Sequence, residues 1–289
     1  MAAAYPAPTV YLAWEQFMQE RSAALCATSI ASDYQQVSTW LKRSPHQQLD
    51  AGRELLTWVL TQDPRPAARR VGMYVKAMYR WASSPDVGLL ALNPVASFQM
   101  PKRPQRTEEI RVIPRNEMRV VLTALREKLS YRGVDWSVFA EFMVQTGLRT
   151  GEVRACKWDD IRDDRIYVHS NYTLTHGHKG STKTNQARWV PLNARAQELL
   201  EHLPRTDSFI FPWSRTAFQS YFTKRMKQLH EQGLIQNRYR PYDLRHSAIS
   251  RWLESGVPVT QAAQWAGNTS EVIWKHYASI TQSYEMPVF

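Results

Sequence analysis

The chain has 289 residues, of which 43% are hydrophobic, and it carries a formal net charge of +11 at pH 7. This length predicts two domains, and Lys and Arg spread along the whole chain favour a polyanionic partner, nucleic acid above all, that meets both halves. Cys26 and Cys156 lie far apart and outside any CxxC or Cys/His cluster, so we expect neither a disulfide framework nor a zinc site, and we place the protein in the cytosol. No window approaches the roughly 18 apolar residues of a membrane span, so no membrane contact is expected.

Residues 8–84 follow a helical period. Apolar residues recur at helical spacing in four sets, which are Tyr11 to Met18, Tyr34 to Leu41, Leu55 to Leu60 and Val71 to Trp81. The last set is interleaved with basic residues, which gives the predicted helix one apolar and one basic face. Such a face is usually only solvated, but beside DNA it would contact phosphates. The candidate DNA contacts are Arg69, Arg70, Lys76 and Arg80.

A domain boundary is predicted near residue 105. Residues 101–115 hold three prolines and alternating charges without an apolar period, which is typical of an exposed linker. We therefore expect a helical DNA-binding domain over residues 1–104 and a second domain over residues 105–289.

The second domain is predicted to be mainly α with a small β-sheet. Strands are expected at 165–172 and 187–192, where β-branched and aromatic residues flank a polar loop, so that the two strands form a hairpin. The predicted helices of this domain are 116–129, 135–145 ended at Gly147, 215–231, 243–254, 260–266 and about 270–280.

Arg149 lies at a predicted helix start. Thr150 is the expected N-cap of a helix that runs through Val153 to Trp158. An anion docked there would meet the guanidinium together with backbone N–H groups. Taken alone, an arginine at such a place is more often a surface residue.

Arg245 lies at a second helix start, where Asp243 is the expected N-cap. In the first turn, the guanidinium would add to the positive end of the helix dipole. An ion pair with Asp243 or Glu254 would explain this arginine equally well.

The polar loop between the two strands could be a phosphate-binding loop or a metal site, but its residues fit neither interpretation well. A phosphate-binding P-loop needs glycine where Thr182 stands and runs from a strand into a helix. His176 and His178 lack a third metal ligand at a useful spacing, so surface positions are expected for both. What remains is a lysine at a hairpin tip, Lys183, able to reach into a groove, with Lys179 as an added DNA contact.

These motifs, in this order and at these separations, resemble the catalytic domain of the tyrosine recombinases of the phage-integrase family over about residues 110–280. That family shows an arginine in a GLRxxE segment, a hairpin lysine ahead of a V-P-L strand, an H-x-x-R-H box, a G-H pair and a nucleophilic tyrosine. The matching residues are Gly147-Leu148-Arg149 with Glu152, Lys183 ahead of Val190-Pro191-Leu192, Arg245-His246, Gly267-Asn268 and Tyr277. The helical first half is similar, with less specificity, to the family's core-binding domain.

Two positions depart from the family pattern. Tyr242 stands where the box begins with His, and Asn268 stands where His or Trp follows glycine. Each side chain can hydrogen-bond a phosphate oxygen, but neither is a proton carrier near pH 7. The reaction then uses a different base or runs slowly. His246 is nearby, and its position in the helix favours a supporting, structural role, as for Glu152.

The resemblance implies a DNA strand transferase. Tyr277 would attack the scissile phosphate and leave a 3′-phosphotyrosine, while Arg149 and Arg245 hold the non-bridging oxygens. Lys183 would protonate the departing 5′-hydroxyl as general acid. The phosphotyrosine conserves the phosphodiester energy, so we expect no ATP, metal or other cofactor. A phenol with an ordinary pKa of about 10 needs a base or cationic surroundings.

The resemblance also implies a homotetramer on two double-stranded DNA sites, in a bacterial or phage setting. Residues 278–289 would form an apolar tail that packs on the neighbouring subunit. Tyr284 is a competing nucleophile, but its spacing from Gly267 is too long for the family register, so Tyr277 is preferred.

Three other functions stay open. The departures at Tyr242 and Asn268 are compatible with a catalytically silent DNA-binding protein of the same fold. A type IB topoisomerase or a hairpin telomere resolvase shares the arginines, lysine and tyrosine. A transcription factor that uses the helical first half explains the charge, but it leaves the ordered motifs of the second half unexplained.

Overall fold

The computed structural model of the protein describes residues 9–22, 34–102, 110–127, 135–173, 177–179, 186–213 and 215–277. The chain divides into two compact units, Met1–Arg106 and Thr107–Phe289. This division lies two residues from the predicted boundary at 104/105. The described residues are mainly helical with a small β-sheet, as predicted. Among the helices described, none combines the length and apolar composition that crossing a membrane requires.

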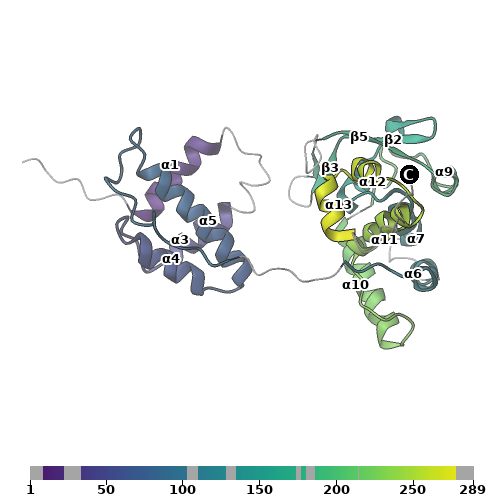
Figure 1. Ribbon diagram of the computed structural model, residues 1–289, viewed down its shortest axis with the longest axis horizontal. Coiled ribbons are helices and arrows are strands. Elements are labelled where there is room, and N and C mark those ends of the chain that lie inside the picture. The colour runs from purple at the N-terminus through teal and green to yellow at the C-terminus, as the bar shows by residue number, and fades with distance from the viewer. Residues whose placement is uncertain are drawn as a thin grey trace, which may run out of the picture. The chain divides into compact units, whose positions relative to one another are not determined.

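The first unit is helical throughout its described elements (Figure 1). Its core is built from aromatic and aliphatic side chains of every helix, and Trp14 stacks on Tyr34 with ring centroids 5.4 Å apart. The four apolar sets read from the sequence lie within these helices or directly at their start, because each set buries one helical face. The helices are α1 (Val10–Ser22), α3 (Gln35–Arg43), α4 (Gly52–Thr61) and α5 (Arg65–Ala82).

The basic side chains of α5 have mixed surroundings. Arg69 Nε donates to the Pro101 carbonyl at 3.1 Å, and Lys76 Nζ donates to the Phe98 carbonyl at 2.7 Å. Both therefore tie the segment that follows α5 to the helix. Arg70 bonds Gln36 at 2.5 Å and Arg80 is exposed. Contact of these residues with DNA stays a prediction.

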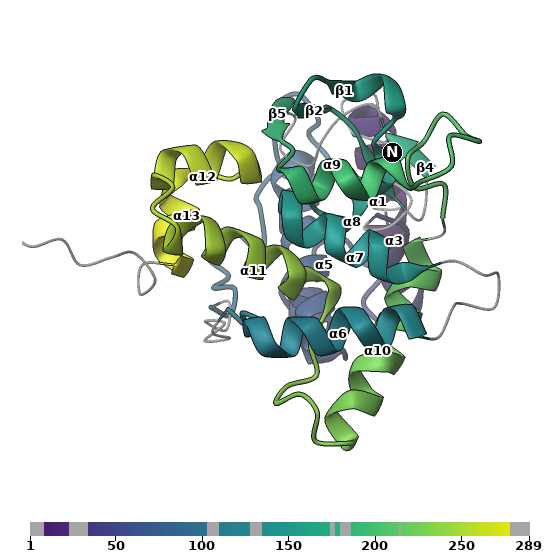
Figure 2. The ribbon, with the colours of Figure 1, turned by 90° about the vertical axis from the view of Figure 1, so that its right-hand side faces the viewer.

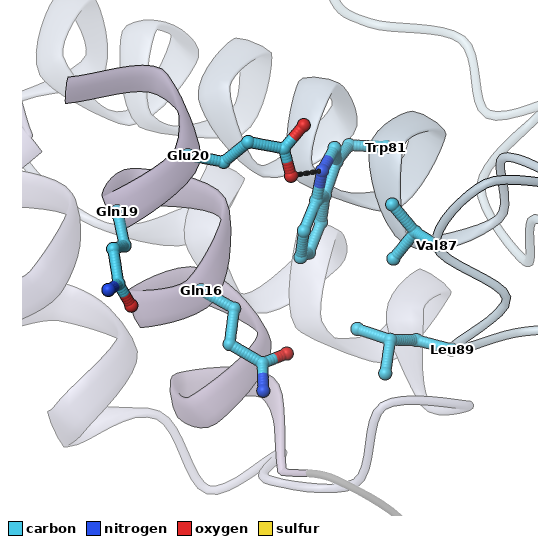
Figure 3. Close-up of a pocket in the computed structure, with 6 residues that line it drawn as sticks. All are labelled: Gln16, Gln19, Glu20, Trp81, Val87 and Leu89. Atoms are coloured by element: carbon cyan, nitrogen blue, oxygen red, sulfur yellow. Dashed lines mark hydrogen bonds between the residues drawn. The ribbon is translucent and has the colours of Figure 1, made fainter. Parts of the chain in front are cut away.

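A shallow pocket of about 340 Å³ lies between α1 and the turn after α5 (Figure 3). Trp81 forms one wall, and its Nε1 donates to Glu20 Oε2 at 2.6 Å. The other residues that line the pocket are Gln16, Gln19, Val87 and Leu89. The charged group at this pocket is a carboxylate, so the pocket is a poor match for a phosphate.

The second unit is organised around α7 (Trp136–Thr146), which is buried on nearly every side. A helix that is apolar all round belongs in a core, and α7 packs against α6, α9 and α11. Trp136 and Phe139 meet Phe211, Trp213 and Phe218 in an aromatic cluster. The surrounding helices are α6 (Arg115–Glu127), α9 (Ala194–Glu201), α10 (Arg215–Glu231) and α11 (Pro241–Glu254).

The predicted hairpin pairs as expected. In the antiparallel pair of β2 (Arg165–Val168) and β5 (Arg188–Pro191), Ile166 lies opposite Val190. Two features were not predicted: β1 (Ile161–Arg162) adds a third strand, and the loop holds a second hairpin of β3 (Asn171–Thr173) and β4 (Gly177–Lys179). His176 and Lys183 lie outside the described residues, as do the side chains of His178 and Lys179.

Both predicted N-caps beside the arginines are wrong. Helix α8 (Thr150–Ala155) has Arg149 as its N-cap and ends before a separate 3-10 turn, η2 (Trp158–Asp160). Helix α11 has Arg240 as its N-cap, and Asp243 Oδ2 accepts from Arg240 N at 2.7 Å. The third helical residue reaches back to the cap in each helix, because Glu152 and Asp243 complete capping boxes.

The predicted helix 260–266 ends where expected. Helix α12 (Val259–Ala266) ends at Gly267 with a φ of 61°, and α13 (Ser270–Tyr277) follows. The two helices lie side by side, next to α11 (Figure 2). Residues 278–289, including Tyr284, lie outside the described residues.

Gly147→Ala should destabilise the protein more than Gly233→Ala. Both glycines have a positive φ, 62° and 70°, so each alanine strains the backbone by about 1–2 kcal/mol. A Cβ on Gly147 would lie 2.4 Å from Trp252 Cη2, whereas Gly233 has no atom within 4 Å. Overpacking should cost a further 1–3 kcal/mol or so at Gly147 alone. Urea unfolding measures both; equal losses would contradict the packing of α7 on α11.

Candidate active site

A buried carboxylate, Glu152, joins two arginines. Its Oε1 accepts from Arg149 Nη1 at 2.9 Å and from Arg188 Nη1 at 3.2 Å, while its Oε2 accepts from Arg149 N and Arg188 Nη2, each at 2.9 Å. Burial acts to raise the pKa of Glu152, but the hydrogen bond and charge of Arg188, with the charges of Arg149 and Arg245, lower it to about 2. The carboxylate is therefore ionised at neutral pH and occupies the anion position that was predicted at the start of α8.

Arg188 is a member of this cluster that sequence reasoning missed. It lies on β5, is 7% exposed, and its Nε donates to the Trp265 carbonyl at 2.7 Å. It thus ties the sheet to α8 and to the last turn of α12. Strand alternation was the available signal, because Arg188 and Val190 point to the same side of the predicted strand and Val190 is plainly a core residue.

Arg245 joins the ends of two helices. It has no exposed surface, and its Nη1 and Nη2 donate to the carbonyls of Gly147 and Ala266, both at 2.6 Å. These carbonyls lie at the negative ends of α7 and α12, so the predicted alternative of an ion pair with Asp243 or Glu254 is replaced by helix capping. Within the described structure, Nε is buried without a hydrogen-bond partner. Burial, followed by the charge of Arg149, lowers the pKa of Arg245 to about 10, which leaves it protonated at neutral pH.

Arg149 meets the same helix end. Its Nη2 donates to the Gly267 carbonyl at 3.0 Å and to Asn268 Oδ1 at 2.7 Å. Its side chain is 15% exposed. Gly267 permits this convergence, because a Cβ there would lie 2.8 Å from Arg188 Cζ as well as straining a left-handed backbone.

Tyr277 is buried at the end of α13, and its hydroxyl lies 2.6 Å from His246 Nδ1. Burial raises the pKa of Tyr277, and the positive charge of Arg245 opposes that rise. Burial also lowers the pKa of His246 to about 4, and the charges of Arg245, Arg240 and His276 act in the same direction. His246 therefore touches the predicted nucleophile directly, which sequence reasoning did not foresee.

Tyr242 packs against His246. It is 43% exposed, and its ring meets the His246 ring edge-on with centroids 4.8 Å apart. The structure thus brings together the predicted residues Arg149, Asn268 and Glu152. His246 contacts both Tyr242, which lies on α11 with Arg245, and Tyr277 of α13. Lys183 is not among the described residues, and the same holds for the side chain of Lys179.

The electrostatics of the site favour an anion. In the described part of the chain, the guanidiniums of Arg149, Arg188 and Arg245 surround the carboxylate of Glu152, so positive charge exceeds negative. Arg149 is partly exposed and leaves N–H donors for an incoming phosphate oxygen, whereas the unpartnered Nε of Arg245 is buried. Among the residues described, His, Cys, Asp and Glu side chains form no group of three or more that could hold a metal ion.

Comparison with known sequences gives a consistent result. The family model described as the phage integrase family matches residues 111–283. The chain is 27% identical to the shufflon-specific DNA recombinase of Escherichia coli over 197 residues, which are 67% of this chain and 46% of that protein. It is 26% identical to the tyrosine recombinase XerD of Caulobacter vibrioides, over 93% of each protein. The chain therefore spans about half the length of the first relative and nearly all of the second.

Solved structures share the fold. The Tn1549 transposon integrase in complex with transposon right-end DNA matches with a TM-score of 0.74 at 14% identity, over 93% of this chain and 94% of that one. The lambda integrase tetramer bound to a Holliday junction matches with a TM-score of 0.68 at 16% identity, over 92% of this chain and 79% of that one. These likenesses extend over both compact units.

Glu152→Gln should destabilise the second unit strongly, because it leaves two guanidiniums without their shared counter-charge. Breaking a buried pair in this way costs about 3–5 kcal/mol. Glu198→Gln is the matched control, since Glu198 is 52% exposed in its pair with Arg195 and such pairs contribute about 0–1 kcal/mol. Urea unfolding at pH 7 should separate the two variants; similar losses would contradict the role of Glu152.

The same carboxylate predicts a pH dependence. Its folded-state pKa of about 2 lies below the ordinary 4.5, so its contribution to stability is present above pH 4.5 and is lost as the pH falls toward 2. The difference in unfolding free energy between the wild type and Glu152→Gln should shrink over this range. A difference that stays constant from pH 5 to pH 3 would show that the charge of Glu152 is not what stabilises the fold.

Proposed function

Because the chain belongs to the phage integrase family, we propose that it is a site-specific DNA recombinase that cuts and rejoins DNA strands through a 3′-phosphotyrosine at Tyr277. The observation that carries this proposal is the position of the Tyr277 phenol. It lies against His246, next to the buried guanidinium of Arg245, in a site with surplus positive charge. A nucleophile beside an anion site is what phosphoryl transfer needs.

Arg149 and Arg245 would hold the non-bridging oxygens of the scissile phosphate. Both guanidiniums are already oriented by helix carbonyls, which favours stabilisation of the charge that develops on the pentavalent transition state. Arg245 has no exposed surface, so it would have to be uncovered when the phosphate binds. Glu152 and Arg188 act behind them as supports. The phosphotyrosine keeps the phosphodiester energy, so rejoining can proceed by simple reversal.

Two further side chains would complete the phosphate contacts. The Oδ1 of Asn268 accepts a hydrogen bond from Arg149. The side-chain amide N–H groups of Asn268 could therefore donate to the phosphate. Tyr242 offers an exposed hydroxyl. Family resemblance assigns Lys183 as the general acid for the departing 5′-hydroxyl.

The first unit would bind the duplex beside the cleavage point, as the family's core-binding domain does. The basic residues of α5 and the charge of +11 support this. Arg80 is exposed on α5, whereas Arg70 would need to exchange Gln36, and Arg69 and Lys76 a backbone carbonyl, for a phosphate. Lys179 would reach the DNA from the second unit.

The working assembly would be a homotetramer on two synapsed double-stranded DNA sites, in the cytoplasm. The lambda integrase structure is itself a tetramer on a Holliday junction, which supports this proposal. Residues 278–289 would pack on the neighbouring subunit, because Met286, Val288 and Phe289 make this tail apolar.

Tyr277→Phe should abolish the covalent protein–DNA adduct on a nicked suicide substrate that carries the protein's own recombination site. Phenylalanine keeps the buried ring and removes the attacking oxygen. Tyr284→Phe is the matched control and should form the adduct at nearly the wild-type rate. An adduct that persists in Tyr277→Phe and vanishes in Tyr284→Phe would transfer the nucleophile to Tyr284.

The same assay separates the rival functions. Specific DNA binding by the wild type without any adduct would indicate a catalytically silent protein. Relaxation of a supercoiled plasmid that lacks the site would indicate a type IB topoisomerase.

Deletion of residues 281–289 should weaken synapsis while sparing the binding of a single DNA site. In the proposed assembly the apolar tail contacts the neighbouring subunit rather than DNA, so its loss should act on subunit contacts. Gel-shift assays with one and two sites measure both steps. Normal synapsis after truncation would contradict the exchange of the tail.

A further inference from the structure

Among the residues that the structure describes, few could serve as a base for the nucleophile. Tyr242 and Asn268 occupy the two positions where the family pattern has groups such as His. Glu152 is committed to Arg149 and Arg188. Of the histidines on α11 and α13, His276 is exposed while His246 is half-buried and lies inside the site.

His246 is held in place for contact with Tyr277. Its Nδ1 lies 2.6 Å from the Tyr277 hydroxyl, and the two rings are inclined at 47° with centroids 5.9 Å apart. The ring of Tyr242 also meets the imidazole edge-on at 81°. The imidazole is thus in contact with two aromatic rings, one of which carries the Tyr277 hydroxyl.

We propose that His246 is the general base that receives the phenolic proton of Tyr277 during DNA cleavage and returns it during rejoining. The inference rests on the proposed function, since it needs Tyr277 to be the nucleophile. It revises the structural role that the sequence alone favoured for His246.

The surroundings make His246 neutral before DNA binds. Burial disfavours its charged form, and the cations Arg245 and Arg240 around α11 and His276 on α13 add to this. A neutral imidazole with its hydrogen on Nε2 presents the lone pair of Nδ1 to the phenol. A DNA phosphate held by Arg245 brings negative charge beside these cations, so the imidazolium becomes easier to form when substrate is present.

The step balances in atoms and charge. An oxygen lone pair of Tyr277 forms the new bond to phosphorus, and the bond from phosphorus to the 5′-oxygen breaks with its electron pair. The phenolic proton moves to Nδ1 of His246, and the leaving oxygen takes a proton from the general acid, for which the proposed function names Lys183. In rejoining, Tyr277 leaves as a phenolate and recovers its proton from the His246 imidazolium.

Two substitutions separate a base from a positioning group. His246→Asn places a carbonyl oxygen near the position of Nδ1, so it keeps a hydrogen-bond acceptor for the phenol but cannot take up a proton. His246→Ala removes both properties. The matched control is His202→Asn, which changes an exposed histidine at the C-terminal end of α9, outside the site.

Single-turnover cleavage of the suicide substrate should fall by about 100-fold or more in both His246 variants, with His202→Asn close to the wild type. Site-specific DNA binding and urea unfolding midpoints are measured alongside, so that a misfolded variant is recognised. A His246→Asn variant that cleaves at nearly the wild-type rate would overturn the proposal, because hydrogen bonding alone would then suffice.

A substrate with sulfur at the bridging 5′ position gives a second readout that is independent of stability. A thiolate leaves without a proton, so this substrate should restore cleavage by Lys183→Ala but not by His246→Ala. Restoration of His246→Ala to the wild-type rate would assign His246 to the leaving-group side and overturn the proposal. Failure of the proposed function looks different, because the wild type would then form no adduct with either substrate.

Discussion

The interaction on which the site depends is the sharing of the Glu152 carboxylate between Arg149 and Arg188. A carboxylate with 1% exposure is stable as an anion only because two guanidiniums bond it. In return, it fixes one arginine from the start of α8 and another from β5. From these fixed positions Arg149 reaches Gly267 and Asn268, and Arg188 reaches Trp265.

The second organising feature is the end of α12. The carbonyls of Ala266 and Gly267 receive Arg245 and Arg149, and the carbonyl of Trp265 receives Arg188. Three guanidiniums therefore converge on one helix C-terminus, where the dipole is negative and where a glycine leaves room for them. The same helix leads through a short turn to α13, which carries Tyr277. The cations and the nucleophile are thus positioned by one short stretch of chain.

The sequence predicted the elements better than their junctions. Helical spacing located α5, α7 and α10 well, because each buries a broad apolar face, and glycine located the ends of α7 and α12. The predicted N-caps, Thr150 and Asp243, were wrong because each helix begins directly after an arginine. Glu152 and Asp243 are the third residues of their helices and bond back to that arginine. The motif order named Arg149, Arg245, Asn268 and Tyr277 through family resemblance.

The motif pattern predicted neither the place of Arg188 in the site nor the contact of His246 with Tyr277. An arginine in a strand is usually exposed, and only its pairing with a buried carboxylate from a distant helix explains its burial. The contact between His246 and Tyr277 joins α11 to α13 across 31 positions of sequence, so no local spacing reveals it. Functional residues of this kind are defined by how helices and strands pack on one another, not by the sequence of a single helix or strand.

The central claim is that the arginines and the tyrosine act on a single phosphorus atom. The most direct measurement is a crystal structure of the protein on nicked DNA with orthovanadate, which mimics the pentavalent phosphorus of the transition state. The account predicts vanadium bonded to the Tyr277 oxygen, with its equatorial oxygens in contact with Arg149 and Arg245. Vanadium bonded to another side chain, or bound away from both guanidiniums, would contradict it.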